Sequence, residues 1–215
     1  MSHRRIIGLT GGIATGKTTV SKHLSTVHQL PVLDADVYAR AAVQPGSPIL
    51  RAIADRYGAD ILLPNGALDR QRLGNIVFQD AAERDWLEQQ IHPYVRDRFA
   101  KAMSDFTDNQ TVVHAVPLLF EAGLTDQATE IWVVACPEAQ QLARLMQRDR
   151  LSLEQAKARI ISQMPLAEKV ARADIVLDNS GEVDALLAKV DRALAREAGE
   201  GEGERKKKHN SEFRI

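Results

Sequence analysis

The stretch Gly11-Gly12-Ile13-Ala14-Thr15-Gly16-Lys17-Thr18 decides the fold. It fits the pattern Gly-x-x-x-x-Gly-Lys-Ser/Thr, in which the glycines let the backbone turn tightly around an anion. Backbone N–H groups and the N-terminus of the following helix face that anion, Lys17 supplies a cation to the phosphates, and the Thr18 hydroxyl is suited to Mg²⁺. The motif therefore predicts a binding site for a nucleoside triphosphate.

The residues on either side of this loop indicate a parallel α/β sheet. An apolar, β-branched run from Arg4 to Thr10 predicts a buried strand, and apolar residues at helical spacing from Lys17 to Val27 predict a helix. A strand, a glycine turn, a helix and a second strand are the usual opening of such a sheet. Four further strands are predicted, at residues 31–33, 111–116, 130–136 and 174–177.

The remaining segments are predicted to be mostly helical. We expect one domain over residues 1–198, with a core formed by 1–36, 107–140 and 160–198. A helical insert occupies 37–106, and arginine-rich helices at 138–150 and 153–164 supply a lid over 141–159. A closing helix is predicted at 183–196, and the Glu/Gly-rich and basic segment 199–215 is predicted to be a disordered tail.

The composition excludes several classes of protein. The formal net charge of −1 and the aromatic content of 5% argue against a surface dedicated to nucleic acid. Cys136 is the single cysteine, which excludes an internal disulfide framework and a cysteine-based zinc site. The apolar runs are too short to cross a membrane. We therefore expect a cytoplasmic protein with neither a nucleic-acid nor a membrane partner.

Two carboxylates follow the second predicted strand, in the segment Asp34-Ala35-Asp36. This is the edge of a parallel sheet where ligands bind. If the extended geometry persists, both side chains point the same way, so that one could hold Mg²⁺ through water while the other accepts a proton from an attacking hydroxyl. The alternative is that one of them only caps a helix. Arg40 could pair with Asp36 on a helix or contact a substrate phosphate.

Arginines recur in the late helices, and one histidine lies in a plausible cleft position. Arg144 and Arg148 are four residues apart and share one helix face, where they could neutralise charge during phosphoryl transfer. The alternative is a solvated face with ion pairs to Glu138 or Asp149. His92 precedes Pro93, a residue typical of a first helical turn, so that His92 could also be a local cap.

Other phosphate-loop proteins fit the sequence less well. A guanine-reading switch protein should carry an Asn-Lys-x-Asp motif, and the sequence contains no Asn-Lys pair. A motor ATPase or helicase normally has an apolar strand that ends in a metal-binding aspartate, whereas the strand at 112–116 runs into Pro117. The acidic pair, the helical insert and the late arginines indicate a small-molecule kinase with a lid.

At the level of its motifs the chain resembles the dephospho-coenzyme A kinases. The matching stretches occur in family order over roughly residues 4–195: 9–18, 34–40 (Asp-Ala-Asp-Val-Tyr-Ala-Arg), 43–46 (Val-Gln-Pro-Gly), 92–95 (His-Pro-Tyr-Val), 117–121 (Pro-Leu-Leu-Phe-Glu), 144–149 (Arg-Leu-Met-Gln-Arg-Asp) and 173–179 (Ala-Asp-Ile-Val-Leu-Asp-Asn). One departure is Ala14, where many members have glycine; it leaves Lys17 and both framing glycines intact.

The resemblance implies a three-layer α/β P-loop kinase fold with a five-stranded parallel sheet, a helical substrate-binding insert and a lid. It implies transfer of the ATP γ-phosphoryl group to the ribose 3′-hydroxyl of dephospho-CoA, the last step of coenzyme A biosynthesis. The residues implied in ATP binding are Gly12, Ile13, Ala14, Thr15, Gly16, Lys17, Thr18, Thr19 and Arg148. Those implied in catalysis are Lys17, Asp36, Asp34 and Arg144.

The same resemblance implies the remaining ligands. Thr18 and Asp34 would hold Mg²⁺, and Asp36 would face the acceptor hydroxyl. The dephospho-CoA site would be lined by Asp36, Arg40, His92, Pro117 and Leu118.

Two other functions stay open from the residues alone. One is a kinase for another small molecule, and the other is a nucleotide-hydrolysing regulator. We expect a monomer or a weak homo-oligomer.

Overall fold

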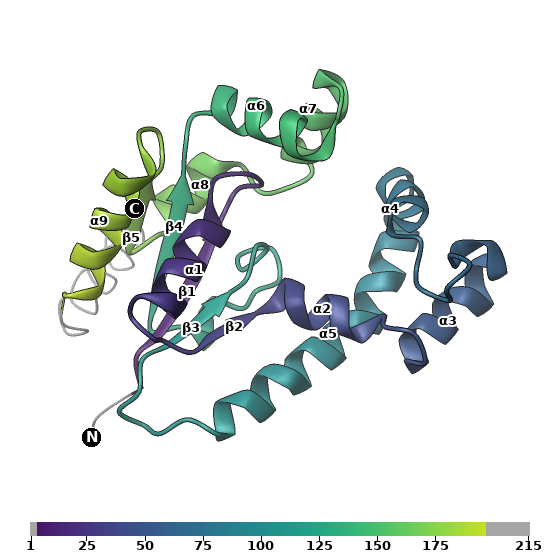
Figure 1. Cartoon of the computed structure of the whole chain (residues 1–215), viewed down its shortest axis with the longest axis horizontal. Helices are drawn as coiled ribbons and strands as arrows, with labels where there is room; N and C mark the ends of the chain where they lie inside the picture. Colours follow the sequence, from purple (N-terminus) through teal and green to yellow (C-terminus); the bar gives the residue numbers. More distant parts are fainter. Residues whose placement is uncertain (1–3, 197–215) are drawn as a thin grey trace, which may run out of the picture. The chain divides into compact units, whose positions relative to one another are not determined.

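The computed structural model describes residues 4–196, so the predicted tail at 199–215 lies outside the described residues. The chain divides into two compact units (Figure 1). The first contains the chain up to Leu33 and from Thr107 onwards, and the second is Asp34–Phe106. Among residues 4–196, no helix has both the length and the apolar composition needed to cross a membrane.

The first unit is built on a five-stranded sheet with the strand order β2-β3-β1-β4-β5. Its strands are β1 (Ile6–Gly11), β2 (Val32–Asp34), β3 (Val112–Ala115), β4 (Glu130–Ala135) and β5 (Ile175–Asp178). The central strand β1 pairs in parallel with β3 and β4, with Leu9 opposite Ala115 on one side and Trp132 on the other. The predicted five-stranded parallel α/β fold is confirmed.

Helices α1 (Lys17–Thr26) and α9 (Val183–Leu194) pack against each other and against the sheet. Alternate residues of β1, Ile7 and Leu9, face these helices and are fully buried. Val20 and Leu24 of α1 complete this part of the core, as the helical spacing of the sequence predicts. The core therefore fixes the start of α1 relative to the end of β1, which are the two ends of the glycine-rich loop.

The alternate side chains of β1 face the opposite layer. Thr10 Oγ1 donates a 2.9 Å hydrogen bond to the carbonyl oxygen of Pro117. That oxygen also accepts a 3.3 Å bond from Lys169 Nζ, on the short helix α8 (Leu166–Ala171), which packs against β4 behind the sheet (Figure 1). Lys169 is fully buried and pairs with Glu121 at 2.8 Å. These contacts hold the Pro117–Glu121 segment, which is followed by a 3-10 turn at Thr125–Gln127.

Two helices follow β4 and correspond to the predicted arginine-rich segment. They are α6 (Glu138–Asp149) and α7 (Leu153–Ile161), and they pack against each other. Ser152 begins α7 with a capping box, in which its hydroxyl accepts from the Gln155 N–H and the Gln155 side chain accepts from the Ser152 N–H. Arg159 of α7 reaches back to Asp149 at the end of α6, at 3.0 Å. The capping box fixes the start of α7, and the ion pair connects α7 to α6.

The second unit is a helical bundle with its own apolar core. Its elements are α2 (Ala35–Ala42), α3 (Pro48–Tyr57), a 3-10 turn (Ala59–Ile61), α4 (Arg70–Gln79) and α5 (Ala81–Ser104). Arg56 lies over the Trp86 ring and forms two hydrogen bonds of 2.7 and 2.8 Å to Glu83. Together with the Tyr57 hydroxyl, these bonds lower the pKa of Glu83 to about 2. They link α3 to α5.

One alternative raised from the sequence is wrong, and one helix was not predicted. Pro93 lies inside the 24-residue helix α5 and not in a first turn, so His92 is no helix cap. A proline in a helix interior removes one backbone hydrogen bond, and α5 continues through it because Trp86, Leu87, Ile91 and Tyr94 pack against the core of the unit. Helix α8 was not predicted, because its six residues are too few to show helical periodicity.

His114 on β3 gives a testable pH dependence of stability. It is buried, and burial lowers its pKa to about 4 from an ordinary value of 6.5. Between about pH 6.5 and 4, His114 is therefore protonated in the unfolded chain but neutral in the folded chain. The free energy of unfolding falls as the pH drops through that window. At pH 5 the loss is about 2 kcal/mol.

We expect the melting temperature of wild type to fall more between pH 7.5 and pH 5 than that of His114→Gln, which cannot be protonated. Differential scanning calorimetry at the two pH values measures this. Equal falls in both proteins would show that His114 does not control the acid sensitivity.

Candidate active site

The glycine-rich loop connects β1 to α1 in a wrapped conformation. Gly16 has φ +108° at the position before the helix, where the left-handed region favours glycine. Thr15 is buried and closes the turn, since its N–H and its Oγ1 both donate to the Gly12 carbonyl oxygen, at 3.3 and 2.8 Å. The Thr18 and Thr19 side chains follow in the first turn of α1 and are exposed.

Three amide side chains from distant parts of the chain hold this loop. Gln141 of α6 donates to the Ile13 carbonyl oxygen at 2.8 Å. Asn179, directly after β5, donates to the Thr15 carbonyl oxygen at 2.7 Å. Gln163, after α7, accepts from the Ile13 N–H at 2.9 Å. The loop is therefore positioned by side chains from α6, from the residue after β5 and from the segment after α7.

Two positions show how closely the loop is packed. A Cβ at Gly12 would lie 2.5 Å from Gln141 Nε2, so that any larger residue there disturbs the amide that holds Ile13. Ala14 has φ +60°, a conformation that costs an alanine about 1 kcal/mol. This explains why glycine suits position 14, and it leaves the course of the loop unchanged.

Arg144 is connected to the loop through Asn179. Its Nη2 donates to the Asn179 carbonyl oxygen at 3.2 Å and to Gln140 Oε1 at 3.3 Å. Its Nη1 is buried and has no hydrogen-bond partner among the residues that the structure describes. A buried cationic N–H group without an acceptor is costly, so this atom is suited to an anionic ligand bound at the loop.

Arg148 and Cys136 are placed differently. Arg148 donates to both oxygens of Asp149, at 2.8 and 3.0 Å, which lowers the pKa of that carboxyl group. This is the ion pair that the sequence left open as the alternative. Cys136 is buried, and burial raises the pKa of its thiol, which disfavours the thiolate form that a nucleophile needs.

The two aspartates belong to the start of the helical unit, and their arrangement corrects one expectation. Asp34 is the last residue of β2 and caps α2, because its Oδ1 accepts from the Asp36 N–H at 2.9 Å. Asp36 already lies in the first turn of α2 and is exposed. Extended geometry therefore ends at Asp34, and the expected alternation that would point both side chains the same way is wrong.

The helical unit contains a pocket of about 370 Å³ on its own. Asp36, Arg40 and Arg70 are its charged residues, and Arg70 Nη2 donates to the Arg40 carbonyl oxygen at 3.4 Å. The rest of the lining is largely apolar: Ala39, Val43, Leu68, Leu73, Gly74, Val77, Leu87 and Ile91. Such a pocket can hold an apolar chain with a polar or anionic end.

The other residues predicted for the acceptor lie elsewhere. His92 is exposed on α5 and is not among the residues that line this pocket, although its neighbour Ile91 is. Leu118 is exposed and Pro117 partly buried, both in the sheet unit, where the Pro117 carbonyl oxygen accepts from Thr10 and Lys169.

Sequence reasoning missed several residues of the site. Gln141, Gln163 and Asn179 hold the loop, Lys169 holds the Pro117–Glu121 segment, and Arg70 lines the pocket. Of these, only Asn179 lay in a motif singled out from the sequence. Arg70 follows Asp69, the N-cap of α4, and a cap residue gives no sign of a pocket beside it.

A wrapped phosphate loop at the carboxyl edge of a parallel sheet, followed by an arginine-bearing helix pair, defines a P-loop kinase. The family model for dephospho-CoA kinase matches residues 5–185. The dephospho-CoA kinase of Trichormus variabilis is 61% identical over 191 residues, which are 89% of this chain and 97% of that protein. The Synechocystis enzyme of the same name is 59% identical over 180 residues, 84% and 90% of the two chains. The chain therefore belongs to the dephospho-CoA kinase family, whose reaction is the last step of coenzyme A biosynthesis.

Solved structures agree with this assignment. TT1252 from Thermus thermophilus has a TM-score of 0.75 at 35% identity, with coverage of 90% of this chain and 97% of that one. The dephospho-CoA kinase from Campylobacter jejuni has a TM-score of 0.64 at 27% identity, covering 88% and 94%. A shikimate kinase from Acinetobacter baumannii, at 14% identity and a TM-score of 0.51, shares the fold alone.

The bond from Asn179 to Thr15 is a testable support of the loop. Asn179→Ala leaves the buried Thr15 carbonyl oxygen without its donor, which costs about 1 kcal/mol. We expect the KM for ATP to rise about 5-fold and the melting temperature to fall by about 2–4 °C. Steady-state kinetics and calorimetry measure both. Gln127→Ala, at an exposed amide of the same unit, is the matched control; an ATP KM unchanged in both variants would contradict the support role.

Proposed function

We propose that this chain transfers the γ-phosphoryl group of Mg-ATP to the ribose 3′-hydroxyl of dephospho-CoA, giving CoA and ADP. The bond between the γ-phosphorus and its bridging oxygen breaks, and a bond from that phosphorus to the 3′-oxygen forms. The observation that carries the proposal is the phosphate loop, held by Gln141, Gln163 and Asn179 in a chain that belongs to this family.

ATP binding is assigned to residues 12–19. The backbone of Gly12, Ile13, Ala14, Thr15 and Gly16 would surround the β-phosphate, where a Cβ at Gly12 would displace Gln141. Lys17 would neutralise charge on the β- and γ-phosphates, and Thr18 and Thr19 begin the helix whose N-terminus faces them.

Magnesium fits the donor set of this chain. The Thr18 hydroxyl and the Asp34 carboxylate are oxygen ligands of the kind that Mg²⁺ prefers, and Thr18 is exposed at the start of α1. When bound, Mg²⁺ neutralises charge on the β- and γ-phosphates. Asp34 would bind Mg²⁺ through its carboxylate while Oδ1 continues to accept the hydrogen bond from the Asp36 N–H.

Asp36 is our candidate for the carboxylate that accepts the proton of the 3′-hydroxyl. It lies on the wall of the pocket in the helical unit, together with Arg40 and Arg70. These two arginines would bind phosphate of dephospho-CoA, and the apolar wall would pack against its uncharged arm. His92, Pro117 and Leu118 remain proposed contributors to the acceptor site.

Arg144 is our candidate for the cation that stabilises the transferring phosphoryl group. The segment 141–159 would act as the lid, and the segment 37–106 would be the acceptor-binding insert. The buried Nη1 of Arg144 has no acceptor among the described residues, and its Nη2 is anchored to Asn179, which supports the loop. Arg148 would join ATP binding only by leaving its ion pair with Asp149. We propose a cytoplasmic enzyme that works as a monomer or weak homo-oligomer on this small molecule, without nucleic acid.

ADP release from Mg-ATP, with and without dephospho-CoA and with nucleoside monophosphates in parallel, tests the proposal. Strong stimulation by dephospho-CoA with CoA as the product is expected. Turnover with a nucleoside monophosphate and none with dephospho-CoA would overturn the acceptor while leaving the phosphate loop intact.

The two aspartates have separable roles. Asp36→Asn is expected to lower kcat by about 10²–10⁴-fold with little change in ATP binding, because it removes the proton acceptor. Asp34→Asn should instead raise the Mg²⁺ concentration needed for half-maximal rate. Kinetics at varied Mg²⁺ separate the two. A larger kcat loss in Asp34→Asn at saturating Mg²⁺ would reverse the assignment.

The two arginines of α6 are a matched pair on one helix face. Arg144→Ala is expected to lower kcat by about 100-fold or more, since it removes a donor to the developing charge. Arg148→Ala should have a much smaller effect, because its guanidinium is engaged by Asp149. Single-turnover rates at saturating ATP measure the contrast. Equal losses in the two variants would remove the special role of Arg144.

A further inference from the structure

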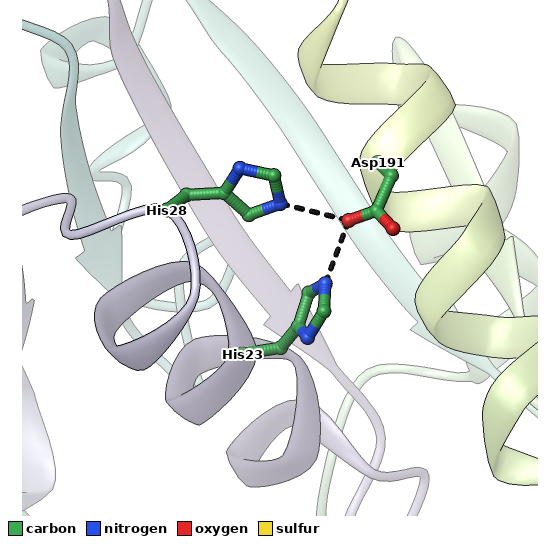
Figure 2. Close-up of side chains that lie close together, drawn as sticks. All are labelled: His23, His28 and Asp191. Carbon is green, nitrogen blue, oxygen red and sulfur yellow. Dashed lines mark hydrogen bonds and ion pairs between the residues drawn. The ribbon is translucent and has the colours of Figure 1, made fainter.

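Three potential metal ligands meet where α1 ends and α9 passes it (Figure 2). His23 Nε2 lies 2.6 Å and His28 Nε2 lies 2.7 Å from the same oxygen, Asp191 Oδ1. The ligand atoms of all three side chains lie within 4.8 Å of one another. None of the three residues has a part in the proposed phosphoryl transfer.

The local backbone brings the two histidines together. On a continuous helix, residues five apart would be separated by about 140° around the axis. Helix α1 ends at Thr26, however, and His28 lies two residues beyond it, where the helical angle no longer applies. The two rings lie 5.2 Å apart at an interplanar angle of 77°.

We propose that His23, His28 and Asp191 form a binding site for a divalent transition-metal ion, with Zn²⁺ as the preferred ion. Two imidazole nitrogens and one carboxylate oxygen are a ligand set that zinc takes in proteins, with water in the fourth position. Mg²⁺ prefers an all-oxygen octahedral set, so this site and the nucleotide site select different cations.

Binding of the ion would require the two nitrogen–oxygen separations to widen slightly. Zinc bonds of about 2.0–2.1 Å set the distance between ligand atoms of a tetrahedron at roughly 3.3 Å, so each nitrogen–oxygen separation would widen by about 0.6–0.7 Å. Asp191 is half exposed and can move, and its exposure also gives water access to the fourth position.

A bound ion would connect α1, which begins at the phosphate loop, to α9, the last helix of the described chain. Without the ion, this connection consists of the apolar contacts between the helices and the two hydrogen bonds to Asp191. A ligand that binds only the folded chain raises its melting temperature. The site would therefore stabilise the helix layer on which the phosphate loop is mounted.

Calorimetric titration of the full-length, tag-free protein with ZnCl₂, in excess Mg²⁺, tests the proposal. The expected result is one high-affinity Zn²⁺ per chain, a higher melting temperature with Zn²⁺ than with EDTA, and a visible absorption spectrum of tetrahedral Co²⁺ when Co²⁺ replaces Zn²⁺. His23→Gln, His28→Gln and Asp191→Asn should each weaken Zn²⁺ binding by at least about tenfold and abolish the Zn²⁺-dependent rise in melting temperature. Asp184→Asn, on the same helix and exposed, is the matched control and should bind like wild type.

Either of two results would overturn the site. One is the absence of a high-affinity Zn²⁺ in wild type. The other is unchanged binding in all three ligand variants, which would assign the ion to other groups and leave the cluster as hydrogen bonds only. Melting curves in EDTA establish that each variant is folded, and His28→Gln, at a position 27% exposed, is the substitution least expected to disturb packing.

Discussion

The rest of the site depends on how the backbone of the glycine-rich loop is held, because a loop that binds phosphate through N–H groups needs other donors for its carbonyl groups. One of its N–H groups, that of Ile13, donates to Gln163. Gln141 and Asn179 bind two loop carbonyl oxygens, at Ile13 and Thr15. Because these amides stand at the carboxyl ends of β4 and β5, the order of the sheet fixes the loop. The Asn179 backbone carbonyl oxygen accepts from Arg144, so the same residue connects the loop to an arginine of α6.

Much of this could be predicted from short patterns. The loop is defined by consecutive residues, and five apolar runs identify the strands, because buried parallel strands are apolar on both faces. The amides that hold the loop could not be predicted, since they lie 128 to 164 residues away along the chain. A single glutamine or asparagine in a helix or after a strand has no signature that marks such a partner.

The aspartates and His92 show a second limit of sequence patterns. Asp34-Ala35-Asp36 is compatible both with a continuing strand and with a helix that begins at Ala35, and only the cap that Asp34 places on the Asp36 N–H decides between them. At Pro93 the local rule predicts a helix start, but apolar residues on both sides pack against one core and keep α5 continuous. Tertiary packing overrides a local preference in this helix.

Phosphorylation of a ribose 3′-hydroxyl is the reaction that the proposed site must perform. The most direct measurement is mass spectrometry of the products that the wild-type enzyme makes from Mg-ATP with the 2′-deoxy and 3′-deoxy analogues of dephospho-CoA. We expect one added phosphate on the 2′-deoxy analogue and none on the 3′-deoxy analogue. Phosphorylation of the 3′-deoxy analogue would contradict the assignment of the 3′-hydroxyl. So would the absence of any phosphorylated product from both analogues and from dephospho-CoA itself.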